Sequence, residues 1–78
     1  MTLYRFGEDA YEVDEERELV RTILFAGQTN QVRSKWKPYE KLETWEIGDK
    51  LFLTVHKSSN FLRTVEVRGV EPALPFTV

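Results

Sequence analysis

Residues 45–70 read WEIGDKLFLTVHKSSNFLRTVEVRGV, and this stretch decides the fold class of the chain. Leu51, Leu53 and Val55 alternate with the residues between them, and Phe61, Val65 and Val67 lie on one face of the second run, which is the period of a half-buried strand. A Gly-Asp pair at 48–49 precedes the first run and favours a turn, because glycine adopts positive φ freely and aspartate hydrogen-bonds its own backbone. Residues 58–60, Ser-Ser-Asn, separate the two runs. The stretch therefore predicts a β-hairpin.

The amino-terminal part of the chain predicts two further short strands. Residues 2–6 alternate and are rich in aromatic side chains, and a turn then leads to residues 10–13. A helix competes for the second segment, because Asp9 followed by Glu12 has the spacing of a capping box. The apolar residues around it make a poor stripe at the helical period, so we expect a strand and then an acidic turn at residues 14–17.

The most apolar run of the chain covers residues 19–26 and ends at Gly27. It is rich in β-branched and aromatic side chains and is short for a buried helix, so it predicts a central strand. At the other end of the chain, residues 71–78 contain two prolines, which are incompatible with regular helix. We expect an extended tail or an edge segment there.

The longest polar segment, residues 28–37, predicts a loop. Residues 38–44 follow it and begin with a proline, which is well tolerated at the first position of a helix because no N–H donor is needed there. Tyr39, Leu42 and Trp45 then recur every three residues. We therefore expect at most one short helix in the chain, formed by residues 38–44 and laid across the end of a barrel.

Short strand-like segments separated by turn signals predict a mostly β fold of about five strands. The 78 residues fit a single domain, and a small barrel or a curled antiparallel sheet, SH3-like or OB-like, suits this length. The core has to be aliphatic and aromatic, because the chain has no cysteine and therefore no disulfide. Its expected members are Leu3, Phe6, Val20, Ile23, Leu24, Phe25, Leu42, Leu51, Leu53, Val55, Val65 and Val67.

The composition gives little support to catalytic or metal-binding chemistry. The chain has one histidine, His56, and no cysteine. The serines near His56 are explained by hairpin turn chemistry and do not form a nucleophile elbow. The acidic residues lack the alternating ligands and central glycine of a calcium loop, and the glycines are isolated. We expect no enzymatic activity, no metal and no cofactor, and, since no membrane span or signal peptide is visible, a cytoplasmic protein.

One segment has the composition of a binding site, because bases and aromatic residues interleave in it. Its members are Arg33, Lys35, Trp36, Lys37, Tyr39 and Lys41. Bases neutralise phosphates and aromatic faces stack on nucleobases, so single-stranded nucleic acid is one hypothesis. Tryptophan, tyrosine and arginine are also the usual anchors of protein interfaces. The net charge of −2 favours a protein partner. A third interpretation is that the aromatic rings only cover the core.

Acidic residues are concentrated at the amino terminus. They are Glu8, Asp9, Glu12, Asp14, Glu15, Glu16 and Glu18. With two arginines, residues 1–18 carry a net charge of −5, whereas residues 19–78, with six acids and nine bases, carry +3. Carboxylates in series can imitate a phosphate backbone. We therefore expect a small regulatory module that binds a protein, and inhibition by occupying the surface of the partner is one mode. Self-association into a homo-oligomer is another.

Overall fold

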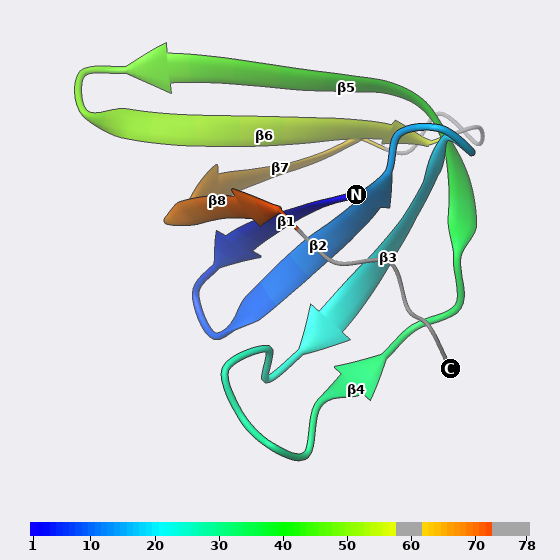
Figure 1. The fold of residues 1–78 in the computed structure, drawn as a ribbon. Coiled ribbons are helices and arrows are strands. Elements are labelled where there is room, and N and C mark those ends of the chain that lie inside the picture. The colour runs from blue at the N-terminus through cyan, green and yellow to red at the C-terminus, as the bar shows by residue number, and fades with distance from the viewer. Residues whose placement is uncertain (58–61, 73–78) are drawn as a thin grey trace.

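A computed structural model describes residues 1–57 and 62–72 of the chain, and Figure 1 shows their arrangement. This part is built from eight strands, namely β1 (Thr2–Phe6), β2 (Asp9–Asp14), β3 (Leu19–Leu24), β4 (Val32–Arg33), β5 (Lys37–Ile47), β6 (Lys50–Lys57), β7 (Leu62–Val67) and β8 (Gly69–Pro72). The predicted mostly β fold is confirmed, with more strands than the five expected. The described residues form no helix, so they include no helix long and apolar enough to cross a membrane.

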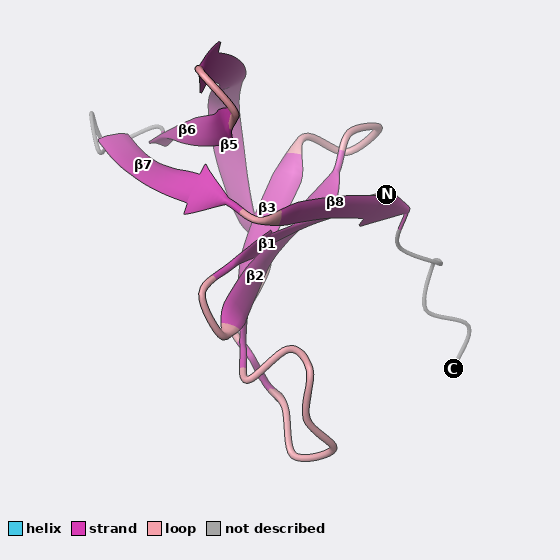
Figure 2. Cartoon of the chain, turned by 90° about the vertical axis from the view of Figure 1, so that its left-hand side faces the viewer, coloured by secondary structure: helices cyan, strands magenta, loops and turns pink. Residues whose placement is uncertain are grey.

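The strands form one curled antiparallel sheet that does not close into a barrel. Its order is β7-β6-β5-β3-β2-β1-β8, and β4 pairs with β3 beside this path. The chain turns sharply between β7 and β8, so that β8 pairs with β1 and the backbone N–H of Arg68 donates to the carbonyl of Arg5 at 2.7 Å. Figure 2 shows β8 lying alongside β1 after this turn. The last described strand is therefore held by the first.

β5 connects the two halves of the sheet. Its first residues, Lys37 and Pro38, pair with β3, and from Tyr39 to Ile47 it pairs with β6. The β5–β6 hairpin consequently extends away from the end of β3, and β7 follows on its other side, as Figure 1 shows. The two parts of the curled sheet, β5–β7 and β1–β3, face one another as two layers and bury the side chains between them.

The main core lies between these two layers. Its buried residues are Tyr11, Val13, Val20, Leu53, Val55 and Val67, which come from β2, β3, β6 and β7. A smaller cluster of Ala10, Ile23 and Ala26, with Leu3 packed against it, lies on the other face of β1–β3. Both faces of β2 are thus covered, which explains why four consecutive residues of this strand, Ala10 to Val13, are buried. Of the expected core, Val20, Ile23, Leu53, Val55 and Val67 are buried.

The helix considered for residues 38–44 does not form, because this segment belongs to β5. The spacing of three between Tyr39 and Leu42 has a different cause. A β-bulge shifts the register between Tyr39 and Lys41, so that one extra residue enters the strand. Tyr39 and Leu42 therefore both pack against the core although three positions separate them.

Leu24 and Phe25 are also not where the sequence placed them, since each is 41% exposed. β3 ends at Leu24, and Phe25 has a positive φ of 56°. That conformation interrupts the alternation of a strand, and the next residue, Ala26, is buried instead. Two hydrogen bonds fix the turn: Phe25 N–H donates to Asp9 Oδ1 at 3.1 Å, and Ala26 N–H donates to the Glu8 carbonyl at 3.0 Å.

The predicted hairpin is confirmed, but its second strand ends at Val67, and residues 69–70, which the sequence placed in the same strand, belong to β8. β6 and β7 form the expected hairpin, and Gly48 has the positive φ, 62°, that its turn requires. Residues 10–13 are strand and not helix, and the acidic turn follows them. The loop at residues 28–37 contains the two-residue strand β4. Of the expected tail, residues 71 and 72 lie in β8, whereas residues 73–78, like 58–61, are outside the described residues.

Two leucines that the sequence placed together in the core make a matched test of this fold. We expect Leu53→Ala to reduce the free energy of unfolding by about 2–5 kcal/mol, because Leu53 is fully buried and its removal leaves a cavity. Leu24→Ala should cost well under 1 kcal/mol, since Leu24 lies at the surface. Urea denaturation followed by circular dichroism measures both. Equal destabilisation by the two changes would contradict the placement of β3.

All three tyrosines of the chain support a second test. Tyr11 lies in the main core, Tyr4 and Tyr39 pack against it, and burial raises the pKa of each above the ordinary 10.0. The unfolded chain releases these phenolic protons near pH 10, before the folded chain does, so stability is retained below pH 10 and falls above it. Absorbance at 295 nm should therefore rise together with the loss of the β circular dichroism signal. Tyrosine ionisation at pH 10 without unfolding would argue against this burial.

Candidate functional site

The segment predicted to bind is divided between the two faces of the sheet. After β4 the chain leaves β3 and returns to it at Lys37. Ser34 is held against β3 in between, because its N–H donates to the Thr22 carbonyl at 2.9 Å and its Oγ accepts from Thr22 N–H at 2.9 Å. The residues that follow Ser34 then point alternately to opposite sides.

Trp36 lies on the side where β2 carries a buried carboxylate. The guanidinium carbon of Arg21 is 4.3 Å from the centroid of the Trp36 ring, which is a cation–π contact. Two nitrogens of Arg21 also contact Glu12 Oε1 at 2.5 Å, and the Glu12 side chain is only 5% exposed. The carboxylate therefore positions the guanidinium, and the guanidinium supports one face of the Trp36 ring.

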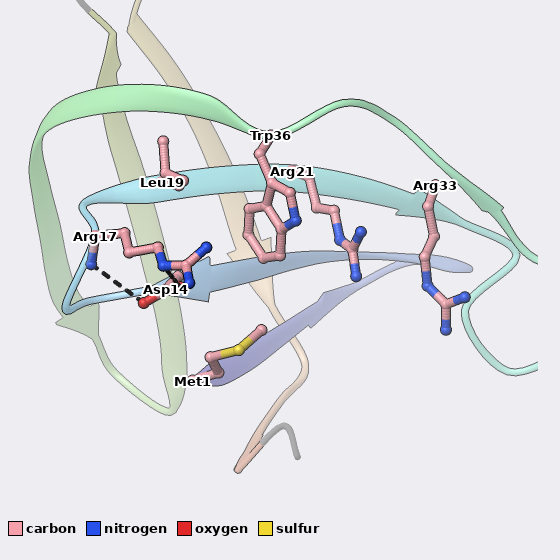
Figure 3. A pocket seen from close by; sticks show the side chains of 7 residues that line it. All are labelled: Met1, Asp14, Arg17, Leu19, Arg21, Arg33 and Trp36. Atoms are coloured by element: carbon pink, nitrogen blue, oxygen red, sulfur yellow. Dashed lines mark hydrogen bonds and ion pairs between the residues drawn. The ribbon is translucent and has the colours of Figure 1, made fainter. Parts of the chain in front are cut away.

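A cavity of about 460 Å³ opens beside this ring. Figure 3 shows the residues that line it: Met1, Asp14, Arg17, Leu19, Arg21, Arg33 and Trp36. Arg17 Nε lies 3.8 Å from Asp14 Oδ2 at one end, and Arg33 Nη2 donates to Gln31 Oε1 at 3.0 Å at the other. The cavity thus combines an aromatic wall, aliphatic surface and several guanidinium groups. This combination suits a ligand that carries both an apolar and an anionic group.

The other predicted binding residues are placed elsewhere. Lys35 and Lys37 line a smaller hollow that also involves Tyr11 and Lys57. Tyr39 packs against the main core, and Lys41 Nζ makes an ion pair of 3.1 Å with Glu43. Of the six predicted residues, only Arg33 and Trp36 therefore line the larger cavity.

The seven acidic residues do not form a continuous surface. Glu12 is buried against Arg21. This ion pair separates the acidic residues at one end of β2 from those at the other end. Asp9 accepts from a backbone N–H, and Glu15 accepts from Thr2 Oγ1 at 2.7 Å and lies 3.9 Å from the terminal amino group. Asp14 pairs with Arg17, whereas Glu8, Glu16 and Glu18 are exposed. Most of these carboxylates serve the fold itself.

Sequence reasoning did not identify Arg17, Arg21, Met1 or Leu19 as neighbours of Trp36. Arg21 did give a signal, because it interrupts the most apolar run of the chain. A charged residue in such a run needs a partner when it is buried. The partner, Glu12, lies opposite Arg21 in the β2–β3 ladder, and only the register of the two strands reveals it.

A second surface that was not predicted lies on the outer side of the β5–β6 hairpin. The rings of Trp45 and Phe52 stack with centroids 4.5 Å apart and planes 15° apart, and Trp45 Nε1 donates to Thr54 Oγ1 at 3.3 Å. Ile47 beside them is 63% exposed. Beyond Tyr39, the edge of β5 that faces away from β6 pairs with no described strand. Open edges of this kind favour pairing with another chain.

His56 lies beside a carboxylate of the neighbouring strand β5. Its Nε2 lies 2.9 Å from Glu43 Oε1. The pKa of the Glu43 carboxyl is lowered mainly by the hydrogen bond and the charge of Lys41, and to a smaller extent by His56. Within residues 1–57 and 62–72, no group of three or more potential ligands is arranged to hold a metal ion.

No family model, curated protein or solved structure matches this chain. The function therefore has to be argued from the chemistry of the surfaces described above.

The support beneath Trp36 can be tested by removing its carboxylate. Glu12→Ala should reduce the free energy of unfolding by about 3–5 kcal/mol, because it leaves the Arg21 guanidinium without its buried counter-charge. The double variant Glu12→Leu, Arg21→Met should recover part of this loss, since no charge then remains. Arg17→Met removes an exposed ion pair and should cost less than about 1 kcal/mol in the same denaturation assay. If Glu12→Ala is no worse than Arg17→Met, Glu12 does not support the site.

Proposed function

We propose that this chain is a small non-enzymatic regulatory module that binds a protein partner, and that the cavity beside Trp36 receives a protruding segment of that partner. The observation that carries the proposal is the placement of a supported tryptophan ring in the wall of a cavity of about 460 Å³. The binding energy of protein interfaces is concentrated in such tryptophan and arginine side chains, at pockets that exclude water.

The position of Trp36 before binding is part of the argument. A side chain that has to be ordered on association reduces the affinity, by about 0.5–1.5 kcal/mol for a residue with many rotamers. Trp36 is already half-buried and stacked on Arg21, which in turn is held by Glu12. Little conformational entropy is therefore lost when a partner contacts the ring.

The lining of the cavity indicates the chemistry of the partner. Leu19, Met1 and the ring of Trp36 offer apolar surface, while the guanidinium groups of Arg17 and Arg33 lie towards its two ends. Guanidinium groups bind carboxylates with two parallel hydrogen bonds. A segment with an apolar side chain next to an aspartate or glutamate fits this arrangement. Such binding would act by occupying the surface of the partner, as an inhibitor does.

Binding of single-stranded nucleic acid is the alternative use of residues 33–41. It requires the aromatic ring and the bases to face the same strand. Lys35 and Lys37, however, line a different hollow from Trp36, and Lys41 is paired with Glu43. This separation favours the protein partner.

The proposal can be tested with peptides selected from a random display library on the folded chain. Trp36→Ala should weaken their binding by about 2 kcal/mol or more, roughly 30-fold, whereas Trp36→Phe should retain part of it. Trp45→Ala is the matched control, because it removes the other tryptophan from a separate surface and should leave the affinity unchanged. Titration calorimetry gives the affinities, and circular dichroism gives the folded fraction of each variant.

Selected peptides that bind Trp36→Ala as well as they bind the original chain would refute the proposal. The nucleic-acid alternative has its own signature, which is saturable quenching of Trp36 fluorescence by an unstructured oligonucleotide. Its affinity would fall with salt, with a slope of about −0.7 for each phosphate neutralised. We expect no such quenching.

A further inference from the structure

A second hollow, of about 110 Å³, lies where β3, residues 34–37 and the end of β6 meet. Its polar lining includes Tyr11, Thr22, Ser34, Lys35, Lys37 and Lys57. The hollow shares Arg21 with the larger cavity but not Trp36, because Lys35 and Lys37 flank the tryptophan in the sequence and line the other side. It therefore has lysines of its own, although one guanidinium borders both the hollow and the cavity proposed for the protein partner.

Apart from Val20, the side chains that line this hollow can all donate hydrogen bonds, and Arg21 is among them. Three lysines provide ammonium groups, the hydroxyl groups can also donate, and no acidic residue is among the described residues that line it. A ligand that satisfies these groups has to be an acceptor and has to carry negative charge.

One of these donors, the hydroxyl of Tyr11, has no hydrogen-bond partner in the described part of the chain. This hydroxyl is buried, and the residue is 1% exposed. Buried polar atoms are nearly always hydrogen-bonded, and an orphaned one costs stability unless a ligand or water reaches it. Phenylalanine would fill the same place without this cost.

Positive charges also face one another here. Burial, followed by the charges of Lys37 and Arg63, lowers the pKa of Lys57. The guanidinium carbon of Arg63 is 5.9 Å from the centroid of the Tyr11 ring, so β7 adds a further cation to the three lysines and Arg21. An anion placed among these groups would replace mutual repulsion with attraction.

We infer that this hollow is a binding site for one tetrahedral oxyanion of the phosphate class, held by the ammonium groups of Lys35, Lys37 and Lys57 and by the hydroxyl of Tyr11. The size agrees with this ligand. A volume of about 110 Å³ exceeds the share of about 30 Å³ that one water occupies, and it is well below the range of about 300–1,000 Å³ typical of drug-sized ligands. A phosphate group fits, whereas a whole nucleotide does not.

Titration with inorganic phosphate at constant ionic strength, followed by amide chemical shifts in NMR, tests the inference. We expect saturable shifts centred on residues 34–37 and on the end of β6. Lys37→Gln should weaken phosphate binding at least tenfold. Lys50→Gln removes the same charge at the opposite end of β6 and should leave the affinity unchanged, which makes it the matched control.

Tyr11→Phe separates a binding role from a structural one. It should weaken phosphate binding several-fold, while the melting temperature without phosphate stays the same or rises, because only the orphaned hydroxyl is removed. Should Tyr11→Phe fail to fold, the comparison of Lys37→Gln with Lys50→Gln still decides the question. Equal effects of those two changes, or no saturable shift with phosphate, would overturn the inference.

The source of the phosphate group is settled by a comparison of probes. Inorganic phosphate, phosphoserine and an unstructured oligonucleotide are titrated at equal phosphate concentration. Binding of the first two with the same dependence on Lys37 supports the site, and their ratio shows whether a free or an esterified phosphate is preferred. Binding of the oligonucleotide alone would contradict a site for a single oxyanion.

Discussion

The carboxylate of Glu12 sets the constraint on which the binding surfaces depend. A charged group inside a protein has to be neutralised by a close partner, and Arg21 fulfils that role from the neighbouring strand. With its guanidinium fixed, Arg21 supports the ring of Trp36. The residues on either side of Trp36 then face the other way, which divides one basic-aromatic segment into two sites of different chemistry. Glu12 thus supports, through Arg21, the side of this segment that carries Trp36.

The sequence allowed the strands with regular alternation to be predicted, and it failed where the alternation is broken. The hairpin of β6 and β7 and the strands β1 and β2 were foreseen from alternation, and β3 was foreseen from its apolar, β-branched run. β5 was not, since the bulge after Tyr39 gives its inward residues a spacing of three, which resembles a helix. Phe25 was misplaced for a related reason, because its positive φ ends the period of β3.

The candidate site could be predicted only in part for a different reason. The composition of residues 33–41 favoured a binding role for this segment. Which of its side chains lie on which face of the sheet, however, depends on where the chain rejoins β3. The number of acidic residues was equally insufficient to predict an acidic surface, because a carboxylate buried in an ion pair and one exposed in a turn look the same in a sequence. Glu12 and Glu16 illustrate the two cases. Cross-strand partners, which carry most of this information, require the register.

The pairing of β1 with β8 has a consequence for the synthesis of the chain. Arg5 and Glu71 are 66 positions apart in the sequence and form an ion pair of 2.8 Å. Leu3 lies opposite Glu71 in the ladder. A ribosome releases Arg5 long before residues 69–72 emerge, so one edge of β1 waits for its neighbour during translation. Pairings between distant positions form slowly, and an exposed edge invites association with other nascent chains. The amino-terminal hairpin therefore exposes this edge of β1 until β8 is synthesised.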